Sequence, residues 1–232
     1  MTESKKTVPV KAVILAFLFI VVLPLLPIFI SGQWDWWEVW LYAGTSVVSF
    51  IVSRVIAGKK NPGLLEERSK YTSQEDAESW DKVLSPLVGF GGVLILIVAG
   101  LDARFDWTAS LSLTLRLVGF GVYLAGHFLG GYALVENAFF SGMVRLQEER
   151  GHHVIDTGPY AWVRHPGYTG ALLTYVGTPL LLNSWWGFIP TAFMFAVLIL
   201  RTVKEDRFLQ ENLEGYRDFT QKTKYRLFPY FW

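Results

Sequence analysis

The chain has 232 residues, of which 52% are hydrophobic and 18% are charged, and its formal net charge is +1. This composition is too apolar for an ordinary soluble domain and is typical of a membrane protein. The chain contains no cysteine, which excludes a disulfide framework, a thiolate metal site and a cysteine nucleophile.

Six apolar segments approach the roughly 20 residues that a helix needs to cross a bilayer. In chain order they are residues 8–30, 38–56, 83–101, 111–135, 166–183 and 185–200. The first segment follows basic residues, as in a signal peptide, but it is longer than a signal core and no A-x-A-like cleavage site follows it. We therefore expect it to stay as a span, and the sequence predicts an all-α, polytopic transmembrane helix bundle of about six spans.

The connections between these segments refine the prediction. The tight turn LLNSWWG predicts that the last two segments form a C-terminal helical hairpin, followed by a tail helix. The spacing of Gly126 and Gly130 favours close packing of the fourth segment against a neighbouring helix. Residues 59–82 mix both charges, which predicts a solvated or interfacial connection, with a lid over a lipid entrance as the alternative.

Basic residues are strongly biased toward one side of this arrangement. Of the 21 Lys and Arg residues, 19 lie in the two termini and the connections on one side, and only Arg104 and Arg116 fall elsewhere. The positive-inside rule then places both termini and the basic connections in the cytoplasm. We expect a multi-pass integral membrane protein whose functional site faces the cytoplasm.

The stretch at residues 158–170, GPYAWVRHPGYTG, precedes the fifth apolar segment. Its Gly-Pro pair predicts a turn, and Pro166 predicts a helix start, whose free N–H groups favour an anion. Each polar residue alone is typical of a membrane interface. The candidate site residues are Tyr160, Arg164, His165, Tyr168 and Gly170. Together they supply donors, a titratable ring, aromatic faces and open backbone, and this density favours a ligand site.

A second group lies at the end of the last span. Arg201 and Glu205 are four residues apart and share one face of a helix. They fit a helix extension with surface ion pairs, or they face the stretch at 158–170, because the start of one hairpin helix adjoins the end of the other. His127, in the middle of the fourth segment, is more typical of a buried hydrogen-bonding group than of a site. The four histidines lack metal-site spacing, so we expect no metal.

The run GHHVIDTGPYAWVRHPGYTG, followed by RTVKEDRFLQENLEGYRDF, resembles the isoprenylcysteine carboxyl methyltransferase family of integral-membrane methyltransferases. That family is itself similar to phospholipid N-methyltransferases. The resemblance covers about a third of the chain, residues 152–225. Two departures are visible: Glu205 and Asp206 replace a pair of glutamates, and HHVI replaces the usual His-x-Leu-Val.

The resemblance implies an S-adenosyl-L-methionine-dependent methyltransferase with a lipophilic acceptor. The acceptor would be the carboxylate of a prenylated cysteine-like group or a lipid amine. Carried over by position, Arg201 would orient the acceptor and Glu205 would be the acidic residue of the cofactor pocket. The implied cofactor contacts are Gln147, His152, Tyr160, His165 and Tyr168. Arg164 or the helix start at Pro166 would suit the cofactor carboxylate.

These expectations give one integral-membrane domain over residues 1–232. Residues 1–136 would form an N-terminal four-span part, and residues 137–232 the cofactor-binding and catalytic part. Membrane lipids are the expected partners, and nucleic acid is not expected. Two alternatives stay open: an NADPH-dependent reductase of the sterol or steroid type, whose C-terminal helices are similar, and a non-enzymatic membrane scaffold.

Overall fold

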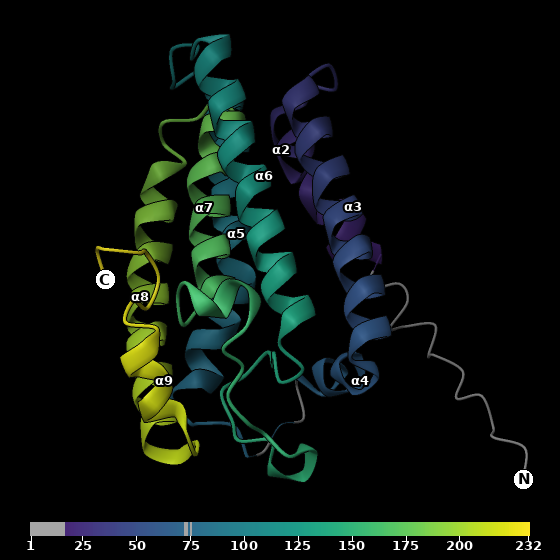
Figure 1. Ribbon diagram of the computed structural model, residues 1–232. Coiled ribbons are helices and arrows are strands. Elements are labelled where there is room, and N and C mark those ends of the chain that lie inside the picture. The colour runs from purple at the N-terminus through teal and green to yellow at the C-terminus, as the bar shows by residue number, and fades with distance from the viewer. Residues whose placement is uncertain (1–16, 72–73, 75) are drawn as a thin grey trace, which may run out of the picture.

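The structure is a computed structural model that describes residues 17–71, 74 and 76–232. The first predicted span, residues 8–30, therefore lies partly outside the described residues. Within them, every assigned element is a helix, which confirms the all-α bundle (Figure 1).

Five long helices form the body of the bundle. They are α3 (Trp37–Lys60), α5 (Asp81–Phe105), α6 (Leu113–Glu136), α7 (Pro166–Leu181) and α8 (Phe188–Asn212). Three shorter helices are α2 (Leu26–Ser31), α4 (Pro62–Ser69) and α9 (Tyr216–Lys222). The long helices stand side by side, while α4 and α9 lie at one end of the bundle together with residues 137–165 (Figure 1).

Three of the described helices, α3, α5 and α6, are long and apolar enough to cross a membrane. The expected number of six spans is not confirmed. α7 has only 16 residues, and α8 carries charged residues in its C-terminal half. Many apolar side chains of the long helices are exposed, for example Phe128 at 74%, as expected for a surface that faces lipid.

The described part of the first apolar segment is not one regular α-helix. It comprises a π-helical turn at Leu18–Val22, a 3₁₀ turn at Leu23–Leu25 and the short α2. Pro24 and Pro27 explain this, because proline lacks the N–H that a continuous helix requires. α2 ends at Gly32, whose φ of +76° suits glycine.

α6 and α7 are packed unusually closely through glycines. A Cβ on Gly126 would lie 2.6 Å from the carbonyl oxygen of Gly170, and a Cβ on Gly177 would lie 2.7 Å from that of Gly119. Only residues without a side chain permit this approach. The packing role predicted for Gly126 is confirmed.

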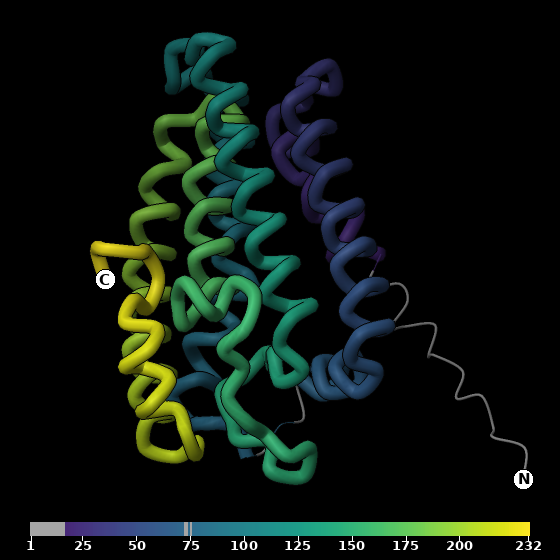
Figure 2. The backbone as a smooth tube through the Cα atoms, in the orientation of Figure 1, coloured from purple at the N-terminus to yellow at the C-terminus, as the bar shows by residue number. Residues whose placement is uncertain are grey.

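The C-terminal tail holds the start of α7 in place. The backbone N–H of Arg164 donates to the carbonyl of Tyr225 (2.9 Å), and the N–H of His165 donates to the carbonyl of Arg226 (2.9 Å). The hydroxyl of Thr169 donates to Leu227 (2.7 Å). The tube in Figure 2 shows the yellow tail running back along α8 from the end that carries α9. Arg226 of the tail also donates to Asp206 of α8 (2.9 Å), so the tail joins both helices of the predicted C-terminal hairpin.

Candidate functional site

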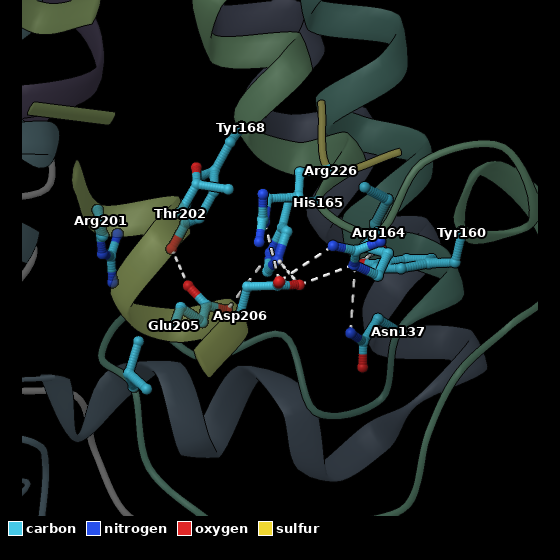
Figure 3. Close-up of polar contacts among 12 residues, drawn as sticks. Asn137, Tyr160, Arg164, His165, Tyr168, Arg201, Thr202, Glu205, Asp206 and Arg226 are labelled. Atoms are coloured by element: carbon cyan, nitrogen blue, oxygen red, sulfur yellow. Dashed lines mark hydrogen bonds and ion pairs between the residues drawn. The ribbon is translucent and has the colours of Figure 1, made fainter. Parts of the chain in front are cut away.

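A cavity of about 340 Å³ lies where the starts of α5 and α7, the C-terminal half of α8 and residues 137–155 meet. This volume is in the range of small-molecule sites. The cavity is lined by Tyr160, Arg164, His165 and Tyr168 from one stretch and by Arg201 and Glu205 from α8. The structure thus brings the two groups together, in line with the alternative in which Arg201 and Glu205 face the stretch at 158–170 (Figure 3).

Glu205 is the one carboxylate among the described residues that line the cavity. It accepts a hydrogen bond from the hydroxyl of Tyr168. The Tyr168 ring stacks on His165 with 5.7 Å between centroids, and the Arg201 guanidinium lies 5.3 Å from the Tyr168 ring. The Glu205 side chain remains 22% exposed, so it can meet a ligand.

Asp206, the next residue, has the opposite environment. It is fully buried and joins three elements. Arg164 Nε and Nη2 donate to its carboxylate at 2.7 and 3.0 Å, Arg226 Nε at 2.9 Å and the Tyr216 hydroxyl at 3.1 Å. His165 Nε2 lies 3.3 Å from the same carboxylate. Burial alone would raise the pKa of Asp206, but the bonds from His165 and Arg164 outweigh it and hold that pKa well below its usual range.

Arg164 is occupied by internal bonds. Besides its two bonds to Asp206, its Nη1 donates to the carbonyls of Thr223 (2.8 Å) and Lys224 (2.7 Å). Its guanidinium therefore fixes the stretch at 158–170 to α8 and to the tail. A contact between Arg164 and a cofactor carboxylate stays a prediction.

Arg201 is held by Asp81 at the start of α5. Its Nε and Nη2 donate to the two carboxylate oxygens at 2.7 and 2.8 Å, and Nη2 also donates to Gly142 (2.9 Å). Asp81 is fully buried and accepts a further bond from the N–H of Val144 (2.7 Å). Sequence reasoning missed Asp81, because an acid before an apolar segment is not distinctive. Arg201 does not pair with Glu205 within hydrogen-bond distance in the described residues, which corrects the ion-pair alternative.

Gly170 does not have the ligand-facing position that the sequence suggested. The sequence suggested that it leaves open backbone for a ligand, but it is buried against α6 and does not line the cavity. A Cβ at Gly170 would lie 2.6 Å from the backbone nitrogen of Gly130. Gly170 is required by helix packing.

Gln147 and His152 occupy different positions. Gln147 is fully buried, its amide donates to Phe139 (2.8 Å), and it is not among the cavity-lining residues. His152 does line the cavity, with its ring 4.5 Å from that of Phe139. Burial, reinforced by the neighbouring His153, lowers the pKa of His152 to about 4, so the ring is neutral at pH 7.

Further lining residues were not singled out from the sequence. Arg68 and Tyr71 come from the mixed-charge connection at 59–82, and Asn137 donates to the Tyr160 hydroxyl at 3.2 Å. Their positions depend on long-range packing, which leaves no periodic signal in the chain. The described residues contain no group of three His, Asp or Glu that could hold a metal ion.

Comparisons with known proteins show which families the chain is similar to. Residues 109–215 match the phospholipid methyltransferase family model. The chain is 33% identical over 73 residues to the protein-S-isoprenylcysteine O-methyltransferase of Saccharomyces cerevisiae, which covers 32% of this chain and 28% of that protein. It is also 33% identical over 79 residues to the protein of that name from Schizosaccharomyces pombe, which covers 34% of this chain and 32% of that protein.

Both matches thus span less than one third of the relative's own length. The resemblance found in the sequence is confirmed: the chain is similar to the phospholipid methyltransferase family and to two protein-S-isoprenylcysteine O-methyltransferases.

Proposed function

We propose that the chain is an integral-membrane methyltransferase that uses S-adenosyl-L-methionine and methylates a lipophilic acceptor. The acceptor is the carboxylate of a prenylated cysteine-like group or a lipid amine. The observation that carries the proposal is the single cavity that joins Tyr160, His165 and Tyr168 to Arg201 and Glu205. The names of the similar proteins support the same chemistry.

The lining of the cavity fits a cationic methyl donor. When bound, S-adenosyl-L-methionine supplies a methyl group on a positively charged sulfur. The carboxylate of Glu205 attracts such a cation, and the ring of Tyr160 adds cation–π attraction of about 1–2 kcal/mol where water is excluded. His152 is neutral at pH 7 and so adds no repulsion.

The remaining side chains position the acceptor. Arg201 is held by Asp81 through Nε and Nη2, so its guanidinium has a fixed orientation beside the cavity. Such positioning of two reactants can lower a barrier by about 7–11 kcal/mol. A carboxylate acceptor needs no base. An amine acceptor must lose a proton, and Glu205 is the carboxylate within the cavity that can accept it.

The first prediction concerns donor binding. Glu205→Gln removes the negative charge from the cavity while keeping the side-chain shape. We expect the wild-type protein to bind S-adenosyl-L-methionine with a dissociation constant in the micromolar range, and Glu205→Gln to bind at least about tenfold more weakly. Isothermal titration calorimetry on the full chain in detergent measures both values.

The matched control is Glu211→Gln, at an exposed acid on the same helix that pairs with Arg207. It should bind the donor as the wild type does. Equal affinity in Glu205→Gln and wild type would contradict the assignment of Glu205. Binding of NADPH instead would favour the reductase, and binding of neither cofactor would favour a scaffold.

Transfer itself is tested with a labelled methyl donor. Incubation with total lipid and prenyl-peptide extracts, followed by mass identification of the product, distinguishes a carboxylate acceptor from an amine.

A further inference from the structure

Arg68 is a cation inside the cavity that the proposed chemistry has not used. It lies near the end of α4, is half-buried and lines the cavity. Its Nη1 donates to the carbonyl of Phe140 at 3.1 Å, and its guanidinium lies 5.5 Å from the Phe140 ring. Among the described residues no carboxylate lies within 4.0 Å of it.

The other arginines that line the cavity are all paired. Arg145 donates to Glu67 at 2.9 and 3.0 Å, Arg164 binds Asp206 and Arg201 binds Asp81, each through two nitrogens. Of the four arginines that line the cavity, Arg68 alone has no carboxylate partner among the described residues. One carbonyl bond leaves most of its five N–H donors available.

A half-buried cation that no described carboxylate pairs with is unfavourable, and an anionic ligand would relieve it. Burial, together with the nearby positive charge of Arg201, lowers the pKa of Arg68. This direction agrees with a lack of negative charge beside the Arg68 guanidinium. The one lining carboxylate, Glu205, already accepts from Tyr168.

The position of Arg68 indicates which molecule brings the anion. Val88 and Gly89 line the same cavity and belong to α5, one of the three helices able to cross a membrane. Arg201, which is close enough to affect Arg68 electrostatically, is anchored to the start of that helix. Leu213 and Phe219, which also line the cavity, come from the region around α9. Part of the cavity lining thus belongs to a helix able to cross a membrane, which favours entry of a lipid-borne molecule beside α5.

We propose that Arg68 positions the lipophilic acceptor by binding an anionic oxygen group, a carboxylate or a phosphate, that the acceptor carries. This inference rests on the proposed function for the identity of the acceptor. A guanidinium can bind either group through two parallel hydrogen bonds, and the apolar wall at Val88 accommodates the tail.

Equilibrium binding of paired probes tests this without requiring turnover. The probes are 3-(farnesylthio)propanoic acid, its primary amide, dodecyl phosphate and dodecanol, each added to the full chain in detergent. We expect the wild type to prefer an anionic probe to its neutral counterpart by about tenfold or more. Arg68→Gln should abolish that preference while binding the neutral probes within about twofold of wild type, and Arg68→Lys should keep part of it.

Arg54→Gln is the matched control. Arg54 is another partly buried arginine without a carboxylate within 4.0 Å among the described residues, but it does not line the cavity. This variant should keep the full preference. The acid and phosphate arms identify which anion is recognised, and an Arg68-dependent preference in either arm supports the proposal.

Two results would overturn it. One is an unchanged preference for anions in Arg68→Gln. The other is a donor affinity about tenfold weaker in Arg68→Gln with the anion preference intact, which would assign Arg68 to the donor carboxylate. Failure of the wild type to bind S-adenosyl-L-methionine would defeat the proposed function instead, and the probe comparison would still report on Arg68.

Discussion

At the scale of residues, the neighbouring acids Glu205 and Asp206 lie in different environments. Glu205 lines the cavity with its carboxylate partly exposed, whereas Asp206 is buried among Arg164, Arg226 and His165. The turn of about 100° between successive helical residues separates the two environments. Asp206 therefore stabilises the frame that holds the stretch at 158–170, and Glu205 is left to meet a ligand.

Asp206→Asn should destabilise the fold by about 3–5 kcal/mol, because it leaves a buried Arg164 without its counter-charge. The pKa of Asp206 is lowered on folding, so its stabilising effect is complete above the unfolded value near 3.8 and is lost as the pH falls below it. The gap in unfolding midpoint between wild type and Asp206→Asn should thus stay constant from about pH 5 to 8 and narrow below about pH 4.

Thermal unfolding in detergent measures this gap. Glu214→Gln, at an exposed acid two residues before Tyr216, is the control and should leave the midpoint unchanged. If Asp206→Asn and wild type had the same thermal unfolding midpoint at pH 7, the Asp206 carboxylate would not stabilise the fold.

At the scale of elements, the α6–α7 contact determines where the site begins. Gly126 of α6 and Gly170 and Gly177 of α7 allow the two backbones to touch. This contact fixes α7 along its length, and Tyr168 in the first turn of α7 is held in consequence. The glycine that the sequence suggested as a ligand surface is thus part of the scaffold beneath the site.

Gly170→Ala should destabilise the protein by about 1–3 kcal/mol, since its Cβ would meet the backbone of Gly130 and cannot be accommodated by a rotamer change. Gly121→Ala, on α6, is the matched control because no atom lies within 4 Å of its added Cβ. There alanine should leave stability unchanged or raise it by up to about 1 kcal/mol. Equal unfolding midpoints for the two variants would contradict the close packing.

At the scale of the whole molecule, the segment 137–155, which contributes to the cavity lining, lies at one end of the bundle, and the α5–α6 turn lies at the other (Figure 1). Aromatic side chains gather near that turn, where Trp107 lies 5.9 Å from Trp186. The distribution of Lys and Arg favours the cavity end as the cytoplasmic one.

The cysteine-free sequence makes this orientation directly testable. Ala109 and Glu148 are exposed at opposite ends of the bundle. In intact cells, a membrane-impermeant maleimide should label Ala109→Cys, while Glu148→Cys should react only after permeabilisation. The reverse pattern would place the cavity on the outer side of the membrane.

Much of the helical framework could be predicted from the sequence. The segment expected at residues 111–135 is α6, Leu113–Glu136, and the segment at 83–101 lies within α5, Asp81–Phe105. Apolar runs of this length have few other structures available in a bilayer, because backbone groups must be bonded within the helix. The adjacency of α7 and α8 followed from a short turn in the same way.

The helices, their hairpin and the two groups of polar residues could be read from the chain, because length, hydropathy and turn residues are local properties. Which polar groups are occupied and which are available depends on how the helices pack. Arg201 is paired with Asp81 across 120 positions, and Asp206 is enclosed by Arg164 and the tail. Arg68 lines the cavity without a carboxylate within 4.0 Å among the residues that the structure describes. Charge pairing inside the protein depends on distances of a few ångströms between distant parts of the chain, and no local pattern specifies those distances.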